Sequence, residues 1–87
     1  MKQESEFYGY AYFRVDYSIG EWRGWGIYPG SCERDAINTA KHRLLVAASA
    51  NIADPVASLA TDDDMAENGM TPEFYRDRQA AYSALTA

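Results

Sequence analysis

The stretch FYGYAYFRVDYS, residues 7–18, constrains the fold most, because it alternates as a half-buried strand does. We predict a strand over residues 7–17. One of its faces carries Phe7, Gly9, Ala11, Phe13, Val15 and Tyr17. The opposite face carries Tyr8, Tyr10, Tyr12, Arg14 and Asp16. The second face should meet water, so its row of three tyrosines needs an explanation.

Residues 18–21, SIGE, predict a turn with Gly20 at a positive φ, and residues 22–28, WRGWGIY, predict the return strand. If Tyr17 opposes Trp22, then Asp16 opposes Arg23 and Arg14 opposes Trp25. We predict this register because a slip by one residue would lose both favourable pairs. Small residues on the inner face leave a shallow trough that could admit a helix; these are Gly9, Ala11, Gly24 and Gly26.

An Ala-rich helix is predicted next, from an N-cap at Ser31 to about Asn51. Three helical pieces should follow. The first begins at Asp54-Pro55, the second at the capping-box pattern of residues 61–64, TDDD, and the last at Thr71-Pro72. The apolar stripe of the last helix is expected to hold Phe74, Tyr75, Ala81, Tyr82 and Leu85.

These elements predict one α+β domain over residues 1–87. Its N-terminal antiparallel β-hairpin packs on the long Ala-rich helix, and short helical segments and a C-terminal helix follow. An 87-residue chain buries a modest core, so its margin of stability should be small.

The net charge is -5, and the excess acid lies in the last third of the chain. Between Asp54 and Glu73 there are six acidic residues and no Lys or Arg. Helix caps account for part of this pattern, because acids stabilise helix starts. The absence of bases suggests an anionic surface as well. It favours a basic protein partner over direct binding of nucleic acid, which needs clustered Lys and Arg.

The sequence offers little for catalysis or for a cofactor. Cys32 is the single cysteine, which excludes an internal disulfide and favours a reducing compartment. His42 lies ten residues away on the same predicted helix, too far for a dyad. The DDD run fails the calcium-loop pattern at Ala66 and Glu67. We therefore expect a non-enzyme without a cofactor or metal. It should be cytoplasmic, with no membrane contact, because no signal peptide or membrane-spanning run is found.

The tyrosine row allows two interpretations. Either the C-terminal helix or a third strand covers it, or it is a contact surface, where Tyr and Trp are enriched. On the second interpretation the partner-binding residues are the aromatic and acidic ones: Tyr8, Tyr10, Tyr12, Trp25, Asp62, Asp63, Asp64 and Glu67.

Together these features favour a non-enzymatic protein-binding module, a small acidic inhibitor that occupies a basic nucleic-acid-binding surface of a partner. Phage-encoded inhibitors of host defence nucleases, the anti-CRISPR class, are the biological setting we expect first. One alternative is single-stranded nucleic-acid binding on the aromatic face, with Arg14, Arg23 and Lys41 at phosphates. Another is a structural or assembly subunit that forms a homodimer through the hairpin edge.

Overall fold

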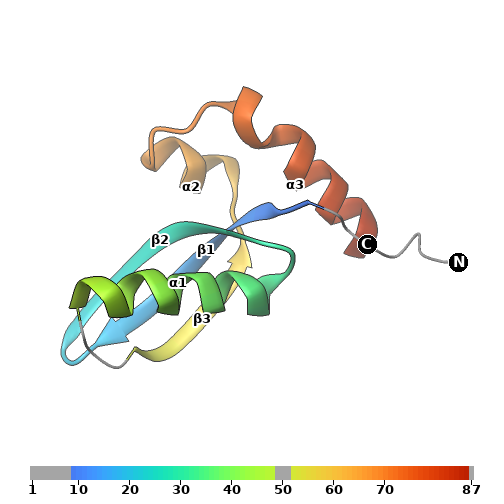
Figure 1. The fold of residues 1–87 in the computed structure, drawn as a ribbon. Helices are drawn as coiled ribbons and strands as arrows, with labels where there is room; N and C mark the ends of the chain where they lie inside the picture. Colours follow the sequence, from blue (N-terminus) through green and yellow to red (C-terminus); the bar gives the residue numbers. More distant parts are fainter. Residues whose placement is uncertain (1–8, 49–51, 87) are drawn as a thin grey trace, which may run out of the picture.

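A computed structural model describes residues 9–48 and 52–86 (Figure 1). The elements are β1 (Ala11–Ile19), β2 (Trp22–Gly30), α1 (Glu33–Ala48), β3 (Ala53–Leu59), α2 (Asp62–Glu67) and α3 (Pro72–Thr86). The predicted α+β class, the hairpin, the long helix and the C-terminal helix are confirmed.

The sheet has three antiparallel strands in the order β2-β1-β3, so β1 is central. Helix α1 lies across one face of the sheet and contacts all three strands (Figure 1). Helices α2 and α3 lie beyond the end of the sheet at which β1 begins and β3 finishes (Figure 1). The first strand of the sequence therefore has a neighbour on both edges.

The predicted hairpin register is wrong by two residues. The turn is Gly20–Glu21 alone, with Gly20 at a φ of 63°, and Ile19 opposes Trp22. The tighter turn adds Ser18 and Ile19, which were predicted to lie in the turn, to the β1 side of the ladder. Because the shift is even, each side chain keeps its predicted face.

Residues 54–59 correct a second prediction, because they form most of β3 and not the start of a helix. Val56 opposes Asp16 and Ala53 opposes Ser18, so two residues of β3 share the position opposite Tyr17. Pro55 stands at this bulge on an edge strand, where a missing N–H breaks no ladder bond. The Asp-Pro pair, which also suits a helix start, concealed the strand.

The inner face of β1 forms the main core. Its alternate side chains Ala11, Phe13 and Val15 are fully buried, and α1 supplies Ala36 and Ala40 against them. The predicted close approach of a small-residue helix occurs at Gly30, where a Cβ atom would come within 2.5 Å of the Ala36 backbone nitrogen. The predicted trough at Gly24 and Gly26 is filled instead, because the rings of Trp22 and Tyr28 lie over these glycines.

A second, smaller cluster covers part of the outer face. Its buried members are Ala60, Met65 and Tyr75, and Tyr12, Ile27 and Met70 pack against them. The tyrosine row is thus partly covered by α2 and α3, while the Tyr10 side chain stays 37% exposed.

Gln79 of α3 joins the helix to the sheet. Its Oε1 accepts a hydrogen bond from the Tyr12 N–H at 2.7 Å, and its Nε2 donates to the Ala60 carbonyl at 3.1 Å. Nε2 also donates to the Tyr12 carbonyl, which accepts from the Ala60 N–H too. The side-chain amide therefore acts like one peptide unit inserted where β1 and β3 separate.

Replacing this amide by an apolar side chain of similar length should destabilise the fold. We expect Gln79→Met to lower the free energy of unfolding by about 2 kcal/mol, because half-buried backbone groups lose their partners. Urea unfolding followed by circular dichroism measures the change. Arg76→Met on the exposed side of α3 is the matched control and should be nearly neutral. Equal effects at both positions would contradict the role of Gln79.

Tyr82 joins the C-terminal half of α3 to β1 and α1. Its ring meets Phe13 edge-on at 5.2 Å, and its hydroxyl donates to Glu33 of α1 at 2.8 Å. Burial, followed by the hydrogen bond to Glu33, raises the pKa of Tyr82 to about 12. The stability linked to this hydroxyl is therefore complete below pH 10 and is lost as the pH rises from about 10 to about 12.

Tyr82→Phe should separate the two effects. At pH 8 the variant loses the hydrogen bond to Glu33 and should be about 1 kcal/mol less stable. Between pH 10 and pH 12 its free energy of unfolding should fall less steeply than that of the wild type. Urea titrations at a series of pH values test this, with Tyr10→Phe as the control at an exposed ring. Parallel pH profiles for Tyr82→Phe and the wild type would refute the assignment.

Candidate functional site

Arg14 connects the two groups of residues that the sequence suggested as a contact surface. Its guanidinium lies over the Trp25 ring at 4.1 Å, and its Nη1 donates to Asp64 at 3.0 Å. Its Nη2 donates to Asp16 at 3.1 Å. The hydrogen bonds to Asp16 and then to Asp64 raise the pKa of Arg14. The predicted contact with Trp25 is thus present as a diagonal pair, whereas Asp16 pairs with Arg14 and not with Arg23.

Asp64 serves the fold. It is the N3 residue of a capping box, in which its carboxylate accepts from the Thr61 N–H and its own N–H donates to the Thr61 hydroxyl. The Thr61 backbone hydrogen bond first, and Arg14 after it, lower the pKa of the Asp64 carboxyl. Its side chain is 13% exposed. The predicted capping box is confirmed, and the charge of Asp64 is compensated within the chain.

The tyrosine row is tied to α3. Tyr10 and Tyr12 meet edge-on at 5.5 Å, and the guanidinium of Arg78 lies over the Tyr10 ring at 4.0 Å. Tyr12 and Trp25 are half-buried, so Tyr10 offers the most open ring of this group. Tyr8 lies outside the described residues.

The other predicted acids lie at the surface of α2. Asp62, Asp63 and Glu67 are exposed. Asp62 also hydrogen-bonds the buried Tyr75 of α3, and burial first and then this bond raise the pKa of the Tyr75 hydroxyl. The bond brings the start of α2 against the first turn of α3, where Glu73 adds its charge near the same hydroxyl.

Phe74 is a surface residue that sequence reasoning missed. It was expected in the buried stripe of the last helix, but the residue is 69% exposed. The inward-facing tyrosines are Tyr75 and Tyr82, seven residues apart, which is the helical repeat that could have separated them from Phe74. Phe74 lines a shallow groove of about 380 Å³ together with Gly9, Glu73, Asp77, Arg78 and Ala81.

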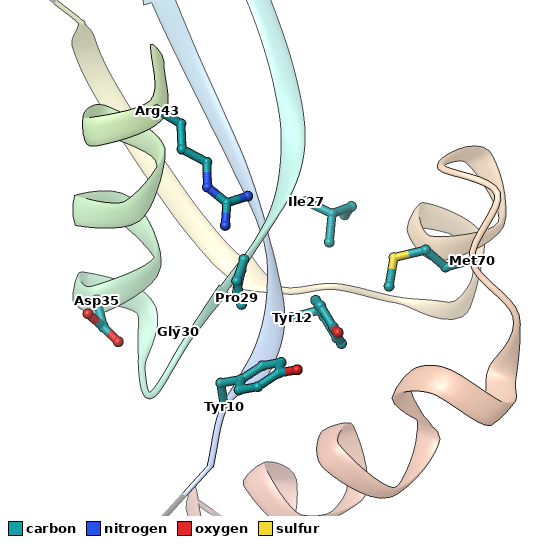
Figure 2. Close-up of a pocket in the computed structure, with 8 residues that line it drawn as sticks. All are labelled: Tyr10, Tyr12, Ile27, Pro29, Gly30, Asp35, Arg43 and Met70. Atoms are coloured by element: carbon teal, nitrogen blue, oxygen red, sulfur yellow. The ribbon is translucent and has the colours of Figure 1, made fainter. Parts of the chain in front are cut away.

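A second groove, of about 570 Å³, opens beside the C-terminal end of β2 (Figure 2). The Tyr10, Tyr12, Ile27 and Met70 side chains line one side of it, and Arg43 extends from α1 on the other side (Figure 2). Arg43 is exposed and approaches the Tyr28 ring at 6.0 Å. Among the described residues, no carboxylate lies within ion-pair distance of Arg43.

Over residues 9–48 and 52–86, no three His, Cys, Asp or Glu side chains come together in a way that could hold a metal ion. In the same part of the chain, none of the helices has the length and apolar character needed to cross a membrane. Comparisons with protein-family models, with curated proteins and with solved structures found no match to this chain.

The two roles of Asp64 lead to a prediction about acid stability. Because its folded-state pKa is lowered, the stability it supplies is present above the ordinary pKa of 3.8 and is lost as the pH falls below that value. We expect Asp64→Asn to cost about 1 kcal/mol at pH 7, and the difference from the wild type to shrink towards pH 2.5. Urea unfolding across this range measures it.

Asp63→Asn makes the same change of net charge at the adjacent exposed position and is the control. It should leave the free energy of unfolding nearly unchanged at pH 7. If the two variants lose stability equally, the cap and the Arg14 ion pair do not account for the effect.

Proposed function

We propose that this chain is a non-enzymatic protein-binding module that uses the outer surface of α2 and α3 to occupy a basic, nucleic-acid-binding surface of a partner protein. The observation that carries the proposal is Phe74, a large aromatic side chain 69% exposed between the acids Glu73 and Asp77. An exposed ring flanked by two carboxylates supports protein recognition, since the ring supplies buried area and the acids supply orientation and association rate.

The charge of this surface agrees with a basic partner. We call the exposed acids of α2 and α3 the acidic surface; they are Asp62, Asp63, Glu67, Glu73 and Asp77. The bases of these helices are Arg76 and Arg78, and Arg78 lies over Tyr10. Carboxylates on successive helical turns can stand where phosphates stand on a nucleic acid, so shape and charge suffice without chemistry.

The contacts of Arg14 reduce the case for phosphate binding on the aromatic face. This arginine would have to leave both Asp16 and Asp64 to reach a phosphate. Tyr10 remains a candidate anchor at the margin of the surface, whereas Asp64, compensated by Arg14, contributes little to the field. A phage-encoded inhibitor of a host nucleic-acid enzyme, of the anti-CRISPR kind, is the setting in which we would look for the partner.

The proposal has an electrostatic part and an aromatic part. A variant that lacks three of the acidic charges tests the first part, and a variant that lacks the Phe74 ring tests the second. The chain is immobilised, incubated with native host extract, and eluted with a salt gradient. The captured protein is then assayed for nucleic-acid binding with and without the free chain. We expect the chain to compete with nucleic acid, and the triple variant Asp62→Asn, Asp63→Asn, Glu67→Gln to weaken capture at least about tenfold and flatten its salt dependence. Phe74→Ala should weaken capture about tenfold or more with the salt dependence kept.

Glu21→Gln is the matched control, because it removes an exposed carboxylate from the turn between β1 and β2, away from α2 and α3 (Figure 1). The chain is immobilised at low density, so that pairing between copies does not affect its capture of the partner. Its capture should equal that of the wild type. Asp64 is left unchanged in the triple variant so that the fold is preserved. A partner that binds the chain and nucleic acid at the same time would show that the acidic surface is not the binding site. Equal capture with the triple variant and with the wild type would show the same.

A further inference from the structure

The outer edge of β2 carries backbone groups that no strand among the described residues pairs with. The pairing of β1 determines which residues of β2 direct their backbone N–H and carbonyl groups away from the sheet. The Tyr12 N–H and carbonyl bond to Gln79 and Ala60 on the β3 side, so in β1 the even-numbered residues turn their backbone groups towards β3. Their partners in β2 turn theirs away from β1. These outward-facing residues of β2 are Arg23, Trp25, Ile27 and Pro29.

This edge is regular where the other edge of the sheet is not. Strand β2 runs for nine residues and pairs with β1 without a register shift, whereas β3 is interrupted by the bulge at Asp54 and Pro55. Pro29 opposes Tyr12, so its missing N–H lies on the outer side and costs no ladder bond. A long, regular edge is a template for another strand.

We propose that the edge of β2 pairs antiparallel with β2 of a second copy of this chain, about a two-fold axis at Trp25. In this register Trp25 opposes its own copy and Arg23 opposes Ile27. Arg23, Trp25 and Ile27 each have an N–H and a carbonyl to exchange. A shift by two residues would oppose Arg23 to Pro29, which has no N–H to donate. The centred register therefore leaves no N–H or carbonyl of Arg23, Trp25 and Ile27 without a partner, whereas the opposite shift places Ile27 against the turn residue Glu21.

The charges at the two ends of the strand agree with the same register. It places Glu21 of one copy opposite Pro29 of the other, at the groove that Arg43 overhangs (Figure 2). Glu21 is exposed, and Arg43 has no ion-pair partner among the described residues. The two-fold axis repeats this contact, so each dimer gains two Glu21–Arg43 pairs.

The dimer has a continuous six-stranded sheet with both α1 helices on one face. Since β2 of the second copy runs in the opposite direction, the α2 and α3 helices of the two copies lie at opposite ends. Phe74 stays open in both copies. Failure of the dimer therefore leaves the proposed function of the acidic surface intact, and the reverse also holds.

Sedimentation velocity over a concentration series gives the first measurement, and we expect a monomer–dimer equilibrium. Amide hydrogen exchange locates the interface. The N–H groups of Trp25 and Ile27 should become protected as the concentration rises, while those of Gly24 and Gly26, which face β1, should be protected at every concentration. A monomer throughout the series, with Trp25 and Ile27 unprotected, would overturn the proposal.

Cysteine cross-linking tests the register. In a Cys32→Ala background, Trp25→Cys brings two thiols opposite each other with a Cα separation of about 5.5 Å, which suits a disulfide. Arg23→Cys is the matched control, because its two copies stand four residues apart, about 13 Å, beyond disulfide reach. Oxidation should link only the first variant. Equal cross-linking of both, or of the control alone, contradicts the centred register.

Charge exchange gives a test that leaves the strand backbone unchanged. Glu21→Lys should weaken dimerisation about tenfold, because two exposed ion pairs become two repulsive contacts. Adding Arg43→Glu should restore the affinity. If the double variant dimerises no better than Glu21→Lys alone, these residues do not meet and the proposed arrangement is wrong.

Discussion

The position of β1 at the centre of the sheet determines most of this structure. Its two edges bond to β2 and β3, its inner face is buried under α1, and its outer face must be covered by what remains of the chain. Where β1 and β3 separate, their backbone N–H and carbonyl groups lose each other as partners. Helix α3 can pack against this end of the sheet because Gln79 forms hydrogen bonds with these groups. One amide supplies these hydrogen bonds and fixes α3 against both strands.

The contacts of Arg14 determine where uncompensated charge is left. By pairing with Asp16 and Asp64, this arginine neutralises acids that lie against the sheet and shields Trp25. Five exposed carboxylates lie on α2 and α3, where Glu73 and Asp77 flank the exposed ring of Phe74. A small net charge of -5 is thus concentrated at one end of the molecule, where it can act on a partner at a distance of about a Debye length.

Local patterns predicted what depends on local interactions. The two faces of β1, the turn at Gly20, the Thr61 capping box and the apolar side of α1 all follow from spacing or from one residue's conformational preference. The hairpin register did not, because two registers of the same parity differ only in turn length and in a few cross-strand pairs. Strand β3 was hidden by Pro55, whose place at a bulge depends on the neighbouring strand. The pairing of Arg14 with Asp64 spans fifty residues of sequence and requires the complete fold.

The two surfaces left open by this fold differ in the forces that would act on them. The edge of β2 offers directional backbone hydrogen bonds, which any strand of the right register can satisfy, so its specificity must come from Pro29 and from the charges at either end. The acidic surface offers the electrostatic field of its carboxylates and the ring of Phe74, and therefore selects a partner by the sign of its charge and by its shape. Helices α2 and α3 cover part of the outer face and reach the Ile27 side chain, whereas the backbone groups at the edge of β2 point along the plane of the sheet, so occupation of one surface leaves the other accessible. A dimer would then present two acidic surfaces facing apart, and would bind a partner with two basic sites more tightly than a monomer through effective concentration alone.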